Sequence, residues 1–289
     1  MLKKTIMMDS CSYFKFRSLA LLFALLSAFI TVSAQGSGVG VLPTGNEYLQ
    51  QKSFAIGSSD ILDTYLSPNQ FYGSTVGFGK WTARKTKMEA SFFNYLDNYF
   101  RTDLSVLDDK FNNGMMVSWT LDNRTALNHR FYNDERFSFL AGPAMAMKLG
   151  AVYNLQNSNN PVQIKALVSL AANVHGIYRF QIGNYPLALN YHLYVPFAGL
   201  TFSPEYGQLY YEIAEFHQYS QTIHFASILN CPTFFQILSL DVPIKNNQLR
   251  ISYLNDFYHY DICNLESDMR SRLFSIGFVH KFETKYNGR

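Results

Sequence analysis

Residues 164–182 read IKALVSLAANVHGIYRFQI, and this stretch decides the fold class of the chain. Every even position is apolar or glycine, whereas the odd positions include Lys165, Asn173 and His175. Side chains that alternate with a period of two belong to a β-strand. The run is long for a strand of a soluble domain, where about 5–6 residues are usual, but it suits a tilted strand that crosses a membrane.

The same alternation recurs over residues 137–153, where every odd position is apolar. The opposite face carries mainly small or uncharged side chains instead of the charges typical of a soluble sandwich. This combination fits an apolar face toward lipid and a mildly polar face toward a lumen. Because backbone groups in lipid need partners, such strands must close into a barrel. The sequence therefore predicts an all-β protein, a closed antiparallel transmembrane β-barrel.

We expect about twelve strands, with ten as the alternative count. Gly183-Asn184 and Asn246-Asn247 have the composition of two-residue hairpin turns. Both fall where short periplasmic turns are expected if the N-terminus is periplasmic. The expected strands lie near residues 61–67, 71–84, 90–106, 115–126, 136–153, 162–182, 185–201, 208–216, 222–230, 233–244, 248–261 and 270–282.

The N-terminus has the pattern of a secretory signal peptide over residues 1–34. Basic residues precede an apolar run from Leu19 to Ile30, and Val32-Ser33-Ala34 is typical of a cleavage site. We expect cleavage after Ala34 and an outer-membrane location; a retained signal anchor is the alternative. Residues 35–60 are expected to form an irregular periplasmic lead-in, and residues 61–289 the barrel.

Composition excludes several functions. The 289 residues carry a net charge of +3, but the signal segment holds four basic residues and one acidic residue, so the remaining 255 residues have 20 of each sign. A basic nucleic-acid footprint is therefore missing. Two cysteines remain, without the spacing of a zinc site. We expect no cofactor.

Four stretches resemble an outer-membrane family of Bacteroidetes of unknown function: residues 62–68, 153–161, 202–213 and 276–279. The resemblance covers nearly the whole mature chain. It implies the location and the barrel fold, and it supplies neither a reaction nor catalytic residues. The last strand, with Phe274, Phe278 and Phe282 on one face, is similar to the C-terminal signal of outer-membrane barrels. The expected partners are therefore outer-membrane lipid and the barrel assembly machinery, and no nucleic acid.

A turn at 183–184 places His175 opposite His192, and Asn173 opposite Tyr194, with all four toward the lumen. Directly opposed side chains have Cβ atoms about 4.5–5.5 Å apart. The histidine pair is either a site that titrates or binds a metal, or an ordinary part of a polar lumen.

A turn at 246–247 places Asp241 opposite Ser252, with Arg250 on the diagonal, as a structural ion pair in the lumen. The same register brings Cys231 opposite Ile262 and next to Cys263. The two thiols either form a disulfide, which the cell envelope permits, or stay free and inert.

Two functions from different classes follow. The first is a narrow pore or a structural membrane element. The second is a lipid-modifying hydrolase in which His192, Glu212 and His224, on adjacent strands, bind a metal or act in acid–base chemistry. Inward tyrosines (Tyr65, Tyr194 and Tyr210) suggest a carbohydrate-stacking platform as a further alternative. Motifs for a nucleophile elbow or a phosphate loop are not found in the sequence.

Overall fold

The computed structural model describes residues 39–40, 42–45, 47–86, 92–111, 113–158, 160–217, 219–245 and 247–283. The predicted signal peptide and its cleavage site lie outside the described residues. The strands are β1 (Glu47–Asp63), β2 (Ser67–Lys85), β3 (Tyr95–Asp109), β4 (Met115–Asn133), β5 (Phe137–Asn154), β6 (Val162–Ile182), β7 (Tyr185–Phe202), β8 (Ile223–Ser227), β9 (Thr233–Ile244), β10 (Asn247–Ile262) and β11 (Leu265–Glu283). Helix α2 (Tyr210–Glu215) and the 3-10 turn η1 (Tyr219–Thr222) lie between β7 and β8.

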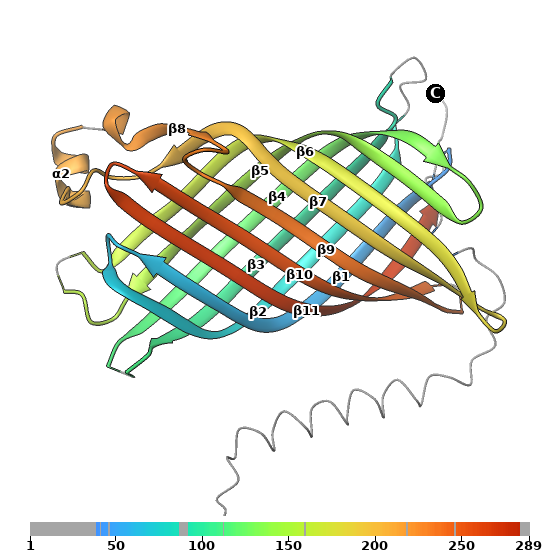
Figure 1. Ribbon diagram of the computed structural model, residues 1–289, viewed down its shortest axis with the longest axis horizontal. Coiled ribbons are helices and arrows are strands. Elements are labelled where there is room, and N and C mark those ends of the chain that lie inside the picture. The colour runs from blue at the N-terminus through green and yellow to red at the C-terminus, as the bar shows by residue number, and fades with distance from the viewer. Residues whose placement is uncertain are drawn as a thin grey trace, which may run out of the picture. The chain divides into compact units, whose positions relative to one another are not determined.

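The strands close into an antiparallel barrel (Figure 1). β1 pairs with β2 on one side and with β11 on the other, and β6 pairs with β7. The ring order is β1 to β7, then β9, β10 and β11. Within the described chain, ten strands complete the ring and β8 is an additional short strand. The predicted all-β transmembrane-type barrel is confirmed, with the lower of the two expected strand counts.

The expected count of twelve strands was too high because two of the expected segments add no strand to the ring. Residues 208–216, expected as a strand, contain α2, because Leu209 and Ile213 lie four apart and the backbone N–H of Ile213 donates to the Leu209 carbonyl (3.1 Å). The expected strands at 222–230 and 233–244 are β8 and β9, which pair with successive parts of the same edge of β7. They therefore occupy one position in the ring, interrupted by residues 228–232.

The expected irregular segment at 35–60 is also too long, because β1 starts at Glu47 and pairs along its whole length with β11. The alternation was hard to detect there because small or polar side chains fill the inward positions. The outward face has Phe54 and Ile56 flanked by Lys52 and Ser58.

The outer surface carries a band of exposed apolar side chains. On β1 the band consists of Phe54 and Ile56, which lie between Lys52 and Ser58 on the outward face. Members of the band include Phe54, Ile56, Val76, Phe78, Leu104, Val106, Leu170, Leu200, Phe274, Ile276 and Phe278.

The two ends of the barrel differ. One end, which we call the terminal end, holds the start of β1, the end of β11 and the tight β6–β7 and β9–β10 turns (right in Figure 1). The other, the helical end, carries α2 and the β1–β2, β3–β4, β5–β6 and β10–β11 connections. Helices in the described part of the chain are too short and too polar to cross a membrane.

Candidate functional site: the polar interior of the barrel

Six charged side chains meet at the centre of the lumen. Three are cations and three are carboxylates, so their formal charges cancel. Asp256 reaches from β10 to side chains on the far side of the ring, with Arg101 Nη2 at 2.6 Å and Lys148 Nζ at 2.9 Å. Isolated buried charges are very costly, and mutual pairing lowers that cost. The remaining members are Asp103, Asp122 and Arg124, with Arg101 Nε 2.8 Å from Asp103 and Arg124 Nη2 3.1 Å from Asp122.

The helical end is closed by a polar contact below an apolar layer. Buried Lys165 forms an ion pair with Asp63 and donates to Ser267 Oγ (2.7 Å). Leu66, in the β1–β2 turn, is buried, and its carbonyl accepts a hydrogen bond from Asn154 Nδ2 of β5 (3.3 Å). The apolar layer at this end comprises Ile61, Leu66, Phe71, Leu107, Met116, Val152, Leu167, Ala226, Cys231, Tyr258, Tyr260, Ile262, Leu265 and Met269.

The loop that contains α2 reaches across the same end. Tyr65 donates its hydroxyl proton to the Gln208 carbonyl (2.9 Å) and packs edge-on against Tyr210. Burial, together with the nearby carboxylates of Asp63 and Glu212, raises the pKa of Tyr65 to about 12. The phenol is therefore a neutral donor at physiological pH.

At the terminal end, the chain before β1 enters the barrel. Val39 and Leu42 are buried in an apolar cluster with inward side chains of four strands. The Gly40 carbonyl accepts hydrogen bonds from Arg179 Nε (3.1 Å) and Nη2 (2.9 Å). A Cβ atom at Gly40 would lie 2.6 Å from the Ala188 Cβ, so the close approach requires glycine. The interior is thus filled at both ends, and three cavities along it each have a volume of about 10 Å³, roughly that of one water molecule.

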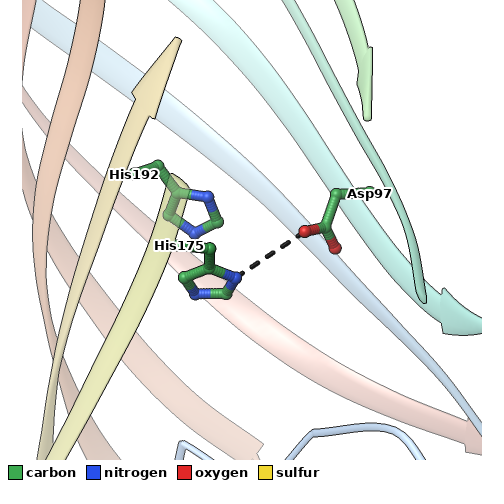
Figure 2. Close-up of side chains that lie close together, drawn as sticks. All are labelled: Asp97, His175 and His192. Carbon is green, nitrogen blue, oxygen red and sulfur yellow. Dashed lines mark ion pairs between the residues drawn. The ribbon is translucent and has the colours of Figure 1, made fainter. Parts of the chain in front are cut away.

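Between the central charges and the terminal end lies a layer with two histidines and an aspartate. His175 of β6 and His192 of β7 are direct partners in the sheet, as the sequence predicts. Their rings stack with centroids 3.6 Å apart (Figure 2). Asp97 of β3 points toward them, with its Oδ2 atom 3.6 Å from His175 Nδ1. All three side chains are buried, and these donors have the types that bind divalent metal ions.

The predicted inward pair of Asp241 and Arg250 is present with a different register. The two residues are directly opposed, and Ser252 faces Ser239 instead of Asp241. Arg250 donates from Nε (2.6 Å) and Nη2 (2.7 Å) to the two carboxylate oxygens of Asp241. The prediction was wrong by two residues because β9 ends at Ile244 and β10 already begins at Asn247, which the prediction had placed in the turn. Asn246 itself lies outside the described residues.

The structure does not bring His192, Glu212 and His224 together. His224 pairs with Thr201, nine residues from His192 on β7, which is about 30 Å along the strand. Its Nε2 atom lies 3.0 Å from the Ser203 carbonyl. Glu212 belongs to α2, where its carboxylate accepts the Leu209 backbone N–H (3.0 Å). The expected tyrosine platform is also separated, because Tyr194 is buried in the middle of β7 whereas Tyr65 and Tyr210 lie at the helical end.

Both described cysteines are free. Cys231 is buried in the apolar layer of the helical end, and Cys263 lies in the β10–β11 turn with its Sγ atom 3.7 Å from His224 Nε2. The two-residue change of register on β10 also removes the predicted opposition of Cys231 and Ile262, since the β9–β10 pairing ends at Thr233 and Tyr258.

Asp97 and the central charges of β3 were not among the residues predicted from the sequence. Residues 90–106 alternate poorly because polar side chains occur on both faces, as the adjacent Asp97 and Asn98 illustrate. A usable signal was present in the odd positions alone: Tyr95, Asp97, Tyr99, Arg101 and Asp103 all point inward.

Three solved structures are similar in outline. The transport unit of the autotransporter AIDA-I from Escherichia coli matches with a TM-score of 0.44 and 6% identity, covering 84% of this chain and 91% of that one. The COG4313 outer membrane channel from Pseudomonas putida F1 matches with a TM-score of 0.37 and 11% identity, covering 86% of this chain and 100% of that one. The translocator domain of the autotransporter NalP from Neisseria meningitidis matches with a TM-score of 0.32 and 8% identity, covering 97% of this chain and 100% of that one. These likenesses carry no argument about function.

The search of curated proteins found no match. A family model described as "Protein of unknown function (DUF3316)" matches residues 19–288, nearly the whole sequence. The chain therefore belongs to the DUF3316 family, whose function is unknown.

Proposed function

We propose that this protein is an outer-membrane barrel with a closed interior, which acts as a structural membrane element and not as an open pore. The observation that carries the proposal is that side chains occupy the lumen at both ends and at its centre. An ion pathway would have to cross the apolar layer at the helical end, the six central charges and the inserted residues Val39, Gly40 and Leu42. Cavities of about 10 Å³ do not connect these layers into a channel.

The proposed outer-membrane location rests on the apolar outer surface of the barrel and on the aromatic outward face of its last strand, β11. The exposed side chains on the outward faces of many strands are large and apolar, as a lipid-facing wall requires. The proposed partners are outer-membrane lipid and, during biogenesis, the barrel assembly machinery, for which the aromatic outward face of β11 offers a C-terminal strand. A Gram-negative host of the Bacteroidetes type is the source that the sequence resemblance implies. We expect export with a signal peptide cleaved after Ala34.

Single-channel recording tests the function. Purified protein in planar bilayers is expected to give no conductance steps, while a known channel protein in the same membranes verifies the assay. Leu66→Gly opens one layer only, so this variant is expected to stay silent as well. Regular conductance steps from the wild-type protein would contradict the proposal and favour a narrow pore.

Location is tested separately. The mature protein is expected to remain with the outer membrane until detergent is added, and to migrate faster in unheated than in heated gel samples. Release by salt or alkali without detergent would contradict the membrane assignment.

The hydrolase alternative has no support in the geometry. Its candidate residues lie in different layers of the molecule, and His192 is enclosed by other side chains instead of facing lipid.

A further inference from the structure

The layer that contains Asp97, His175 and His192 differs from the rest of the interior in how its charge is balanced. The buried cations Arg101, Lys148 and Arg250 each have a carboxylate oxygen within 2.9 Å. Among the described residues, by contrast, no lysine or arginine forms an ion pair with Asp97, which is itself 3% exposed. Within the described structure, the one possible ion-pair partner of Asp97 is the imidazole of His175, at 3.6 Å.

One histidine of the layer also lacks hydrogen-bond partners. His175 is 2% exposed, and neither of its ring nitrogens makes a hydrogen bond within the described structure. Its Nδ1 atom faces Asp97 at 3.6 Å, too far for a good hydrogen bond. Leaving a buried polar group without a partner is costly, so the arrangement calls for a ligand that both groups can share.

We propose that Asp97, His175 and His192 bind one divalent transition-metal ion, with Zn²⁺ as the representative case. One donor atom from each residue lies within 4.8 Å of the others. A tetrahedral ion with bonds of about 2.0–2.1 Å holds its ligand atoms about 3.3–3.5 Å apart. Side-chain rotations that shorten the distances between the three ligand atoms by roughly an ångström would therefore complete the set. Two imidazoles and a carboxylate suit zinc and its neighbours better than magnesium or calcium, which prefer oxygen.

Outer contacts hold the carboxylate in place. Asn128 Nδ2 donates to Asp97 Oδ2 (2.8 Å), and the side-chain oxygen Oδ1 of Asn128 accepts from Asn173 Nδ2 (2.7 Å). Bound carboxylates and imidazoles in metal sites are commonly oriented by such partners. On the other side, the Trp81 ring lies edge-on to both histidines, at centroid distances of 6.5 and 6.0 Å.

The route to the site leads from the terminal end. A cavity of about 10 Å³ is bounded by Gly40 and Leu42 of the inserted segment and by Asp97 and His175. This cavity lies on the side of the site that faces the terminal end. The inference does not depend on whether the barrel conducts ions.

Metal binding by the tag-free, full-length mature barrel in detergent tests the proposal. Equilibrium dialysis against Zn²⁺ and the visible absorption of Co²⁺ are expected to show one ion per chain. His175→Gln and His192→Gln should each weaken binding more than the roughly 10–100-fold that loss of an outer partner costs. The matched control is His259→Gln. His259, Glu266 and Asp268 form a second group of possible metal ligands, on the outer surface, and this substitution removes its histidine. This variant should bind the ion as the wild type does.

Three results would overturn the proposal: no binding by the wild type below millimolar concentrations, full binding by both interior variants, or loss of binding in His259→Gln. Heat-modifiable migration verifies that each variant is folded. If the interior variants do not fold, electron paramagnetic resonance of Cu²⁺ bound to the His259→Gln protein decides instead. Couplings to two imidazole nitrogens support the site, and couplings to one or none refute it.

Discussion

Asp256 offers the sharpest test of how the interior is stabilised. Its carboxylate lies among three cations, at 2.6 Å from Arg101, 2.9 Å from Lys148 and 3.5 Å from Arg124. The substitution Asp256→Asn preserves shape and volume but removes the negative charge. It changes a neutral group of six charges into one with an excess of one buried positive charge.

Removing one partner of a buried ion pair typically costs about 3–5 kcal/mol, because the other charge is left uncompensated. We expect Asp256→Asn to lower the free energy of unfolding by this amount, about two to three and a half orders of magnitude in the unfolding equilibrium. The double variant Asp256→Asn with Lys148→Met restores neutrality at similar volume. We expect it to regain at least half of the loss, because apolar replacement of a buried pair is often close to neutral.

Urea unfolding in lipid vesicles, followed by tryptophan fluorescence, measures both effects, since Trp81 is buried inside the barrel. The control is Asp108→Asn, which removes the same charge from an exposed position on β3 and should change stability by no more than about 0.5 kcal/mol. The reasoning is refuted if Asp256→Asn costs less than about 1 kcal/mol, or if the double variant is less stable than the single one.

Three further predictions concern the ends of the barrel. Gly40→Ala places a Cβ atom against Ala188 at a backbone φ of +63°, so we expect residues 39–45 to leave the lumen and become sensitive to protease while the barrel stays intact; unchanged proteolysis would contradict this contact. The pKa of Tyr65 is raised by burial to about 12, above its usual 10, so its contribution to stability is complete below pH 10 and is lost as pH rises from 10 to 12. Protease cleavage of the α2 loop should increase over that interval, whereas Tyr65→Phe should remove the pH dependence and an unchanged profile would refute the assignment. Finally, both thiols are free, so maleimide should modify partly exposed Cys263 in the folded barrel and buried Cys231 only after unfolding, and a mass consistent with a disulfide would contradict the structure.

Much of the wall could be predicted from the sequence because lipid contact imposes a simple rule on it. On β6 and β7 the outward positions are apolar and the turn at Gly183 has a positive φ of 61°, as a two-residue hairpin requires. The contact between His175 and His192 followed from that turn alone. The predicted position of the β9–β10 turn was wrong because Lys245 takes a positive φ of 54°, which is uncommon for lysine. The asparagines at 246 and 247 were therefore a misleading signal for the turn.

An error of two residues in register leaves every side chain on the same face of its strand. For this reason Asp241 and Arg250 were correctly placed inside the barrel although their partners were wrong. Contacts across the lumen obey no such local rule. The approach of Asp256 to Arg101 joins strands 155 residues apart in the sequence and depends on closure of the ring, which a pattern along one strand does not encode.

The chain has few charged residues, and the interior uses them in matched sets. A barrel in lipid has an apolar outer surface and a polar interior. Its buried charged side chains therefore need partners of opposite charge, whereas the apolar core of a soluble protein holds few such charges. Lys165, Arg250 and the six central charges meet that demand with carboxylates or cations of this chain. The layer with Asp97 and the two stacked histidines does not, and it lies next to the end where the chain enters the lumen. A structural role accounts for the matched layers. The unmatched layer requires a cation from outside, and its titration with metal is therefore the experiment most able to reveal a function beyond that of a closed wall.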